Sequence, residues 1–237
     1  MNDNMALSLI EETSSFSVQK TIKFLADKFP GRVSFSTSFG MEDQVITDMI
    51  FAENLPIKVF TLDTGRHFEE TYKIHNRTLS QYDKKIQVYH PNHSNVEQLL
   101  TNKGPFSFYE SQENRKECCH IRKVEPLGRA LQGEVIWITG LRRAQSENRE
   151  HLDSFVFDAT NEIIKYNPLI DWSLEQVQQY IKDHHIPYNI LHDRGFASIG
   201  CAPCTRAIEP GQDFRAGRWW WENNSTQECG LHATSND

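Results

Sequence analysis

The chain has 237 residues, of which 38% are apolar and 24% charged, so it is long enough for one domain with a proper core. Its 25 Lys and Arg residues against 32 Asp and Glu residues give a net charge of −7, which argues against a nucleic acid or an anionic membrane as partner. No apolar run approaches the ~20 residues of a membrane span, and the start of the chain lacks the pattern of a secretory signal. We therefore expect a cytoplasmic protein that holds any anionic ligand with a local basic cluster.

Strands and helices alternate along most of the chain. Hydrophobic periodicity predicts helices over 18–29, 41–53 and 67–82 and strands over 33–38, 57–62 and 86–89. A helical stretch that is interrupted around Pro126 and ends near Leu131 precedes a fourth strand at 134–139, and short strands over 151–169 lead to a capped helix over 173–184. This order predicts an α/β fold with a mostly parallel sheet flanked by helices on both faces.

The last part of the chain has a different character. From about Gly195 the pattern is irregular, with Cys, Pro, Gly and Arg residues, three consecutive Trp residues and a polar tail. The sequence contains no internal repeat and no low-complexity linker. We therefore predict a single domain over 1–237, with residues 205–237 as a C-terminal arm.

Polar motifs follow three of the predicted strands, where parallel α/β sheets bind their ligands. Ser36–Asp43 joins small hydroxyl side chains to a helix start, which suits an anion, although such turns also serve only as helix caps. Asp63 and Arg66 follow the second strand, where an Asx-turn is the alternative. Arg142 and Arg143 follow the fourth and suit a phosphate or sulfate oxygen. The Gly-Lys-Ser/Thr of a Walker loop is missing, which disfavours NTP hydrolysis of that type.

Four of the five cysteines form two tight pairs, Cys118-Cys119 and Cys201-Ala202-Pro203-Cys204. In a reducing compartment, such pairs are typical of a zinc site or of a [4Fe-4S] cluster. Adjacent side chains on a helix point about 100° apart, which favours the larger cluster and leaves zinc as the alternative. Arg122 and Lys123 lie beside the first pair and would offset the negative charge of a cluster.

The fifth cysteine, Cys229, lies near the end of the polar tail and close to His232. Basic neighbours stabilise a thiolate and raise its reactivity, so Cys229 is a candidate nucleophile on a segment that can approach and leave a site. The alternative is an exposed cysteine without a role.

Together these motifs resemble the thioredoxin-dependent adenylyl-sulfate (APS) reductases, within the phosphoadenylyl-sulfate (PAPS) reductase family. The resemblance covers nearly the whole chain and rests on seven motifs, namely Ser38–Asp43, Leu62–Arg66, Cys118-Cys119 with Arg122–Leu127, Thr139–Ser146, Cys201–Cys204, Arg215–Trp221 and Glu228–His232.

The resemblance implies a modified PP-loop fold and the reduction of APS to sulfite and AMP in sulfate assimilation and cysteine biosynthesis. It implies one [4Fe-4S] cluster per subunit on Cys118, Cys119, Cys201 and Cys204. It implies Cys229 as the nucleophile that carries an S-sulfocysteine, with thioredoxin or glutaredoxin as reductant. The residues that it places around the substrate are Ser38, Phe39, Gly40, Leu62, Asp63, Gly65, Arg66, Lys123, Arg142, Arg143, Arg215, Arg218 and His232. It leaves open whether the chain forms a homo-oligomer.

Three other functions compete with this interpretation. The first is reduction of PAPS, or of both nucleotides, although PAPS reductases without the two cysteine pairs form a separate group. The second is an adenylating enzyme of the ATP pyrophosphatase type, which would leave Cys229 without a role. The third is a sensor that carries a cluster or zinc and has no turnover.

Overall fold

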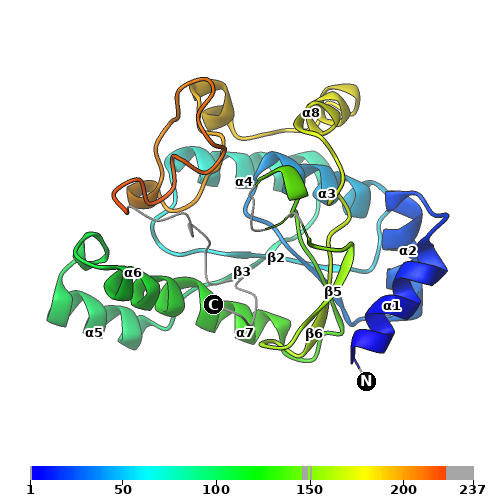
Figure 1. The fold of residues 1–237 in the computed structure, drawn as a ribbon, viewed down its shortest axis with the longest axis horizontal. Helices are drawn as coiled ribbons and strands as arrows, with labels where there is room; N and C mark the ends of the chain where they lie inside the picture. The colour runs from blue at the N-terminus through cyan, green and yellow to red at the C-terminus, as the bar shows by residue number, and fades with distance from the viewer. Residues whose placement is uncertain (1, 146–148, 150, 223–237) are drawn as a thin grey trace. The chain divides into compact units, whose positions relative to one another are not determined.

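The computed structural model describes residues 2–145, 149 and 151–222 (Figure 1). The chain divides into two compact units, each built from segments that are distant in the sequence. The first unit comprises residues 1–61, 69–87 and 133–190, and the second comprises 62–68, 88–132 and 191–237. We describe each unit separately.

A six-stranded sheet with the order β3-β2-β1-β4-β6-β5 organises the fold. Its strands are β1 (Val33–Ser36), β2 (Lys58–Leu62), β3 (Gln87–Tyr89), β4 (Ile136–Ile138), β5 (Phe155–Asp158) and β6 (Ile163–Tyr166). β1 pairs in parallel with β2 and β4, and β4 pairs in parallel with β6, whereas β5 is antiparallel to β6. The predicted α/β class and mostly parallel sheet are confirmed.

The helices of the first unit are α1 (Asn2–Thr13), α2 (Val18–Lys28), α3 (Met41–Ala52), α4 (Glu69–Tyr82) and α8 (Leu174–Asp183). α2 and α8 both pack on α3, and α1 packs on β5 and β6 (Figure 1). α3 is buried over nearly its whole length because it lies between these neighbours. α8 begins with a capping box in which the side chains of Ser173 and Gln176 bond each other's backbone N–H groups.

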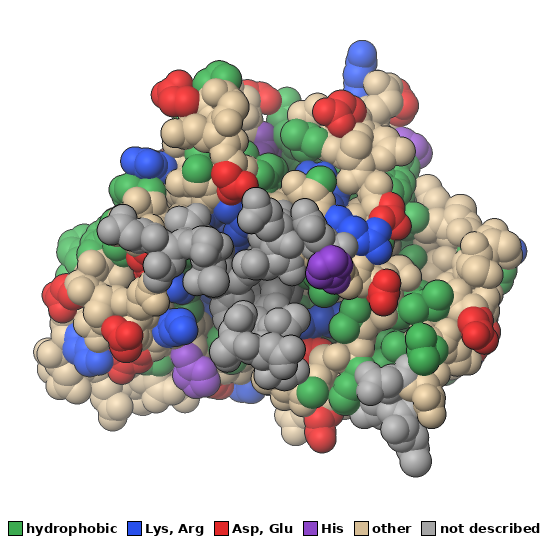
Figure 2. Space-filling model, viewed as in Figure 1, with side chains coloured by type: hydrophobic (Ala, Val, Ile, Leu, Met, Phe, Trp, Pro, Cys, Tyr) green, Lys and Arg blue, Asp and Glu red, His purple; other side chains and the backbone are tan. Residues whose placement is uncertain are grey.

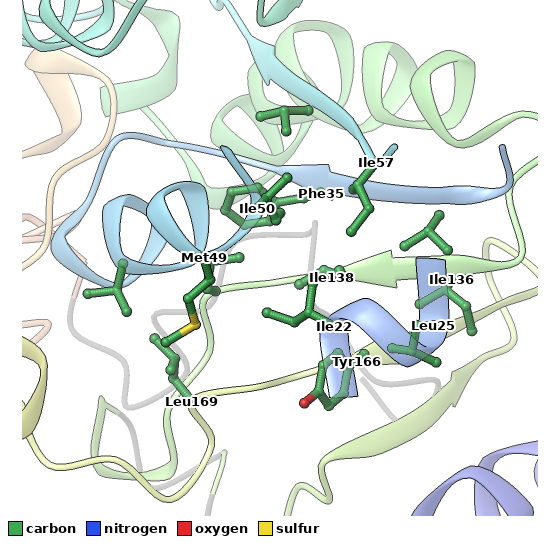
Figure 3. Close-up of a cluster of buried hydrophobic side chains, with 14 of the residues drawn as sticks. Ile22, Leu25, Phe35, Met49, Ile50, Ile57, Ile136, Ile138, Tyr166 and Leu169 are labelled. Atoms are coloured by element: carbon green, nitrogen blue, oxygen red, sulfur yellow. The ribbon is translucent and has the colours of Figure 1, made fainter. Parts of the chain in front are cut away.

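The core of the first unit fills the space between the sheet and helices α2 and α3 (Figure 3). Ile136 and Ile138 are two residues apart on β4 and share one face, as the period of a strand requires. Ile22 and Leu25 of α2 and Ile50 of α3 contribute to the same cluster, and all five side chains are fully buried. Continuous apolar strands of this kind are typical of a sheet interior.

The second unit is smaller and mainly helical. Its elements are α5 (His93–Lys103), the 3₁₀ helix η1 (Ser107–Tyr109), α6 (Gln112–Cys119), the π-helix η2 (His120–Val124), α7 (Glu125–Leu131) and the 3₁₀ helices η5 (Ile190–Arg194) and η6 (Ala202–Cys204). Sequence predicted a helix interrupted around Pro126, and the structure places a π-helical turn directly before it. None of the helices in the described part of the chain is long and apolar enough to cross a membrane.

Candidate functional site

In the first unit, the loop after β1 is held by the first turn of α3. One carboxylate oxygen of Asp43 accepts hydrogen bonds from the backbone N–H and the hydroxyl of Ser38, at 2.6 and 2.7 Å. Phe39 has a positive φ of 62°, and its buried ring stacks on His75, so its contribution to a ligand site is limited to the backbone. Gly40 is the N-cap residue of α3 and leaves that helix without a side-chain cap. The loop is thus fixed before any ligand binds.

Asp43 is electrostatically unusual. Its burial raises the pKa of the carboxyl to about 6, against the lowering effect of the Ser38 hydrogen bonds and with a further rise from nearby Glu42. A carboxylate that costs energy to ionise and accepts two hydrogen bonds from one residue is suited to holding a loop.

The loop after β4 is tied to the same helix turn. The Nε atom of Arg142 donates to Glu42 at 2.7 Å, and its side chain is only 2% exposed. Gly140 lies directly against Asp43, so that a Cβ atom at this position would overlap the carboxylate. Arg143 pairs with Asp171 and is half-buried. Arg142 is therefore engaged within the protein, and Arg143 is the more accessible of the two arginines.

In the second unit, the segment after β2 forms a tight turn that faces the cysteines. Asp63 accepts a hydrogen bond from the N–H of Gly65 at 2.8 Å, which is the Asx-turn that the sequence allowed. Thr64 is buried, with its hydroxyl 3.3 Å from the sulfur of Cys201. The backbone oxygen of Arg66 accepts from the N–H of Ala202 at 2.8 Å. The Leu62–Arg66 turn therefore packs against the loop that carries the second cysteine pair.

All four paired cysteines line one pocket of the second unit. Cys118, Cys201 and Cys204 are buried and Cys119 is half-buried, and none of the four forms a disulfide within the described residues. The pocket is lined by Arg66, Phe108, Arg115, Cys118, Cys119, Arg122, Lys123, Cys201, Cys204, Arg218 and Trp219. Two segments more than 80 residues apart thus bring their thiols together with several basic side chains.

The protonation of these thiols is governed by burial. Burial raises the pKa of Cys118 above its usual value, against the lowering effect of the nearby guanidinium groups. The pKa of Cys204 rises to about 12, through burial and the neighbouring Cys201. Without a bound cation these two groups are neutral at pH 7, so they are not nucleophiles in this state.

The Trp219 ring packs against three arginine side chains of this unit. Its ring is fully buried, and the guanidinium groups of Arg115, Arg218 and Arg215 lie over it at 4.6, 4.8 and 5.8 Å. Arg218 also passes against Gly200, where a Cβ atom would overlap its guanidinium. Gly200 therefore leaves the space that the guanidinium of Arg218 needs, and the ring of Trp219 provides the flat face over which it lies.

Within the part of the chain that the structure describes, two buried N–H groups on residues that line the pocket have no hydrogen-bond partner, namely Nε of Arg122 and Nε1 of Trp219. Buried donors without a partner cost about 1–3 kcal/mol each, so both groups suit a negatively charged or sulfur-bearing occupant. Among the described residues, no three His, Cys, Asp or Glu side chains are grouped closely enough to hold a single metal ion.

The model of the phosphoadenosine phosphosulfate reductase domain matches residues 32–207. The chain belongs to this family. It is 50% identical over 202 residues to the adenosine 5'-phosphosulfate reductase of Agrobacterium fabrum, which covers 85% of this chain and 78% of the relative.

Solved structures support the same placement. The PAPS reductase of Candida auris, solved with phosphate, is 29% identical, with a TM-score of 0.71 over 87% of this chain and 96% of its own. The FMN adenylyltransferase of Candida glabrata has a TM-score of 0.54 at 17% identity, over 92% of this chain and 79% of its own, and shares the fold alone. The fold of the PAPS reductase family is thus the one that the sequence predicted.

The residues that the PAPS reductase resemblance singled out fall into three groups. Ser38, Phe39, Gly40, Arg142 and Arg143 lie in the first unit, and Leu62, Asp63, Gly65, Arg66, Lys123, Arg215, Arg218 and the four paired cysteines lie in the second. Cys229 and His232, like Ser146 of the Thr139–Ser146 motif, lie outside the described residues.

Sequence reasoning did not single out several residues that build these sites. Asp43 and Glu42 stood inside a quoted motif without a role, yet they hold both loops of the first unit. Thr64 stood inside the Leu62–Arg66 motif without a role, yet its hydroxyl contacts Cys201, and Arg115, which no quoted motif contains, lines the thiol pocket. Acidic residues in the first turn of a predicted helix are a sequence signal that could have marked Glu42 and Asp43, whereas nothing in the sequence indicates Arg115.

Charge on the surface is mixed. On the face drawn in Figure 2, basic and acidic side chains are interspersed rather than gathered into one field of a single sign. This agrees with the net charge of −7 and with basic groups that are concentrated inside the thiol pocket instead.

Proposed function

We propose that this chain reduces adenylyl sulfate to sulfite and AMP in assimilatory sulfate reduction, which supplies cysteine biosynthesis. The observation that carries the proposal is the pocket of the second unit, where all four paired cysteines meet Arg66, Lys123 and Arg218. Relatives with 50% and 49% sequence identity that are named adenosine 5'-phosphosulfate reductases support APS as the substrate. We place the reaction in the cytoplasm.

We propose that Cys118, Cys119, Cys201 and Cys204 hold one [4Fe-4S] cluster. The four thiols line one pocket, and the buried N–H groups of Arg122 and Trp219, which have no hydrogen-bond partner within the described residues, suit the sulfur atoms of such a cluster. When bound, the cluster supplies a fixed charge next to the substrate-binding side chains. Ligation would also hold the cysteine sulfurs as thiolates, despite the burial that raises the pKa of Cys118 and Cys204.

We assign the covalent step to Cys229, the one cysteine that the proposed cluster does not use. In our proposal, the Cys229 thiolate attacks the sulfur of APS, a sulfur–sulfur bond forms, and the bond to the bridging oxygen breaks. AMP leaves with that electron pair, and Cys229 becomes an S-sulfocysteine. Arg66, Lys123 and Arg218 neutralise the oxygens of the sulfuryl group during the attack, because like charge otherwise repels the thiolate.

The second half of the cycle needs a dithiol protein. We propose thioredoxin, with glutaredoxin as the alternative. One of its thiolates attacks the Cys229 sulfur, sulfite leaves with the bonding pair, and the second thiol resolves the mixed disulfide. Two electrons therefore pass from the dithiol to the sulfate sulfur, and Cys229 returns as a thiol.

Mass spectrometry of the enzyme mixed with APS before any reductant tests this proposal. We expect one added SO3 on the peptide that contains Cys229, with one AMP released per chain. Cys229→Ser should bind APS, form no adduct and produce no sulfite. Sulfite production by the wild type with thioredoxin but without an adduct on Cys229 would contradict the mechanism.

PAPS is the second candidate substrate, because the matching family and the Candida auris structure carry its name. Sulfite release from APS and from PAPS, measured side by side, separates the two. A kcat/KM for PAPS equal to that for APS would replace the proposal with an enzyme of dual specificity.

A further inference from the structure

The two arginines that follow β4 are held by ion pairs of different kinds. The side chain of Arg142 is 2% exposed, and its Nε atom donates to Glu42 at 2.7 Å. The side chain of Arg143 is 34% exposed and pairs with Asp171, whose side chain is 71% exposed. An ion pair between groups that water reaches is weak, so the guanidinium of Arg143 can leave Asp171 at little cost in free energy.

The backbone around Arg143 is held by bonds other than this ion pair. The N–H of Arg143 donates to the carbonyl oxygen of Ile170 at 2.9 Å, and the N–H of Arg142 donates to the side chain of Gln145 at 3.1 Å. These bonds fix the 3₁₀ helix η3 (Arg143–Gln145) and attach it to the loop that follows β6. The side chain of Arg143 is therefore the part that can move while its backbone stays in place.

Asp171 has a fixed position on the loop after β6. Leu169 and Ile170, which precede it, are buried, and the N–H of Trp172 donates to the carbonyl oxygen of Leu169 at 2.9 Å. β4 and β6 are neighbouring parallel strands, so Asp171 and Arg143 follow the carboxyl ends of adjacent strands. Both residues belong to the first unit.

The carboxylate of Asp171 binds the guanidinium that an anionic ligand would need. The carboxyl ends of parallel strands are where α/β sheets bind their ligands, and an arginine there can donate two N–H groups to phosphate or sulfate oxygens. A carboxylate offers an equivalent pair of acceptor oxygens. Asp171 and the ligand therefore compete for Arg143, and only the fraction of the protein in which Arg143 has left Asp171 can offer this contact.

We propose that Asp171 is a latch on Arg143, which holds the guanidinium in the free protein and releases it to an anionic oxygen of the substrate. This inference rests on the function proposed above, because it takes the phosphosulfate group of APS as the ligand. Asp171 itself contacts no substrate atom and acts only through Arg143. The latch lowers the affinity for every anion that uses Arg143, so that free sulfate and phosphate, which lack the contacts of a nucleotide, dissociate readily.

Equilibrium binding of APS to the anaerobic holoenzyme tests the latch, with Cys229→Ser as the background in which no adduct forms. We expect Asp171→Asn to lower the Kd for APS about two- to fivefold at low ionic strength, the population effect of one exposed ion pair. This factor should approach one in concentrated salt, because screening weakens the internal pair. Asp171→Glu keeps the carboxylate and should keep the Kd of the background protein.

Steady-state kinetics in the protein with Cys229 intact give a second measurement. Asp171→Asn should lower the KM for APS and leave kcat unchanged. The reason is that Arg143 contacts the substrate in both the bound ground state and the transition state, so the latch affects both equally.

Two controls identify the group on which Asp171 acts. In an Arg143→Gln background, Asp171→Asn should leave the Kd for APS unchanged, because the two residues form one unit. Glu12 and Lys28 form the matched control, a half-exposed pair at 2.5 Å between α1 and α2. Glu12→Gln makes the same change in net charge as Asp171→Asn and should not alter the Kd.

The outcomes separate this inference from the function on which it rests. A chain that binds no APS contradicts the proposed function, and the latch falls with it. Normal APS binding that Asp171→Asn leaves unchanged or weakens overturns the latch alone. So does an equal gain in affinity from Asp171→Asn in the Arg143→Gln background, or from Glu12→Gln, since the effect would then come from net charge or from another group.

Discussion

At the scale of single residues, Asp43 determines the shape of two loops. It accepts two hydrogen bonds from Ser38 after β1, and its other oxygen lies against Gly140 after β4. The next residue along the helix towards its start, Glu42, holds Arg142 of the second loop. Two adjacent carboxylates in one helix turn thus position the polar ends of two neighbouring parallel strands.

Gly140→Ala tests this arrangement. The added methyl group would overlap the Asp43 carboxylate, so we expect a loss of about 1–3 kcal/mol in the free energy of unfolding. Gly128→Ala is the matched control, since its Cβ meets nothing within 4 Å in α7, and a helical alanine should stabilise by about 0.5–1 kcal/mol. Urea denaturation measures both changes. An unchanged free energy of unfolding for Gly140→Ala would mean that the Asp43 carboxylate can move aside.

At the scale of elements, hydrophobic periodicity identified most of the first unit. Helices α2, α3 and α4 and strands β1 and β2 all lie within two residues of their predicted bounds. Their apolar faces are regular because one continuous core covers them. Two helices, α1 and α5, were not predicted. α5 buries only Leu99 among its eleven residues, so its sequence shows little hydrophobic periodicity.

The helix that carries the first cysteine pair departs from the simplest prediction. Pro126 lacks an N–H and its ring crowds the carbonyl four residues earlier, so a regular α-helix cannot pass through it. The structure absorbs this in the π-turn η2, directly after Cys119. Sequence located the interruption but not its form, a π-turn that carries Arg122, one of the residues that line the pocket.

The candidate site was predicted as a set of residues and not as a geometry. Cys118 and Cys204 could be grouped by type and spacing, because paired thiols have few other uses. The hydrogen bond from Arg142 to Glu42 could not be predicted, because these residues are 100 positions apart in the chain. Contacts of that range arise from the fold, and no local pattern encodes them.

The cap of α6 allows a prediction at the same scale. The hydroxyl of Ser111 accepts from the N–H of Asn114 and satisfies one of the free donors at the start of the helix. Ser111→Ala should therefore cost about 1 kcal/mol in the free energy of unfolding, whereas Ser111→Asp should retain the cap. Denaturant unfolding of the three proteins checks this, and equal stability of the alanine and aspartate variants would contradict it.

At the scale of the whole molecule, the two units differ in what stabilises them. The sheet unit has a large apolar core. The core of the second unit is small, and three of its six buried members are Cys118, Cys201 and Cys204, beside Leu99, Phe108 and Trp219. A small core needs an additional crosslink, and a group bound to all four thiols would join two distant segments of the chain.

The proposed cluster predicts that removal of iron loosens the second unit and spares the first. Hydrogen exchange by mass spectrometry of the anaerobic protein, before and after chelation, should rise over residues 107–132 and 195–222 and stay unchanged over 33–61 and 133–145. Cys204→Ser should reproduce the chelated pattern, whereas Cys229→Ser should keep both iron and protection, because the proposed cluster uses the other four thiols. Exchange that rises equally in both units would show that the bound group stabilises the whole fold. Unchanged exchange after verified loss of iron would place the stability of the second unit in its protein contacts alone, such as the Arg115–Glu222 pair and the stacking on Trp219.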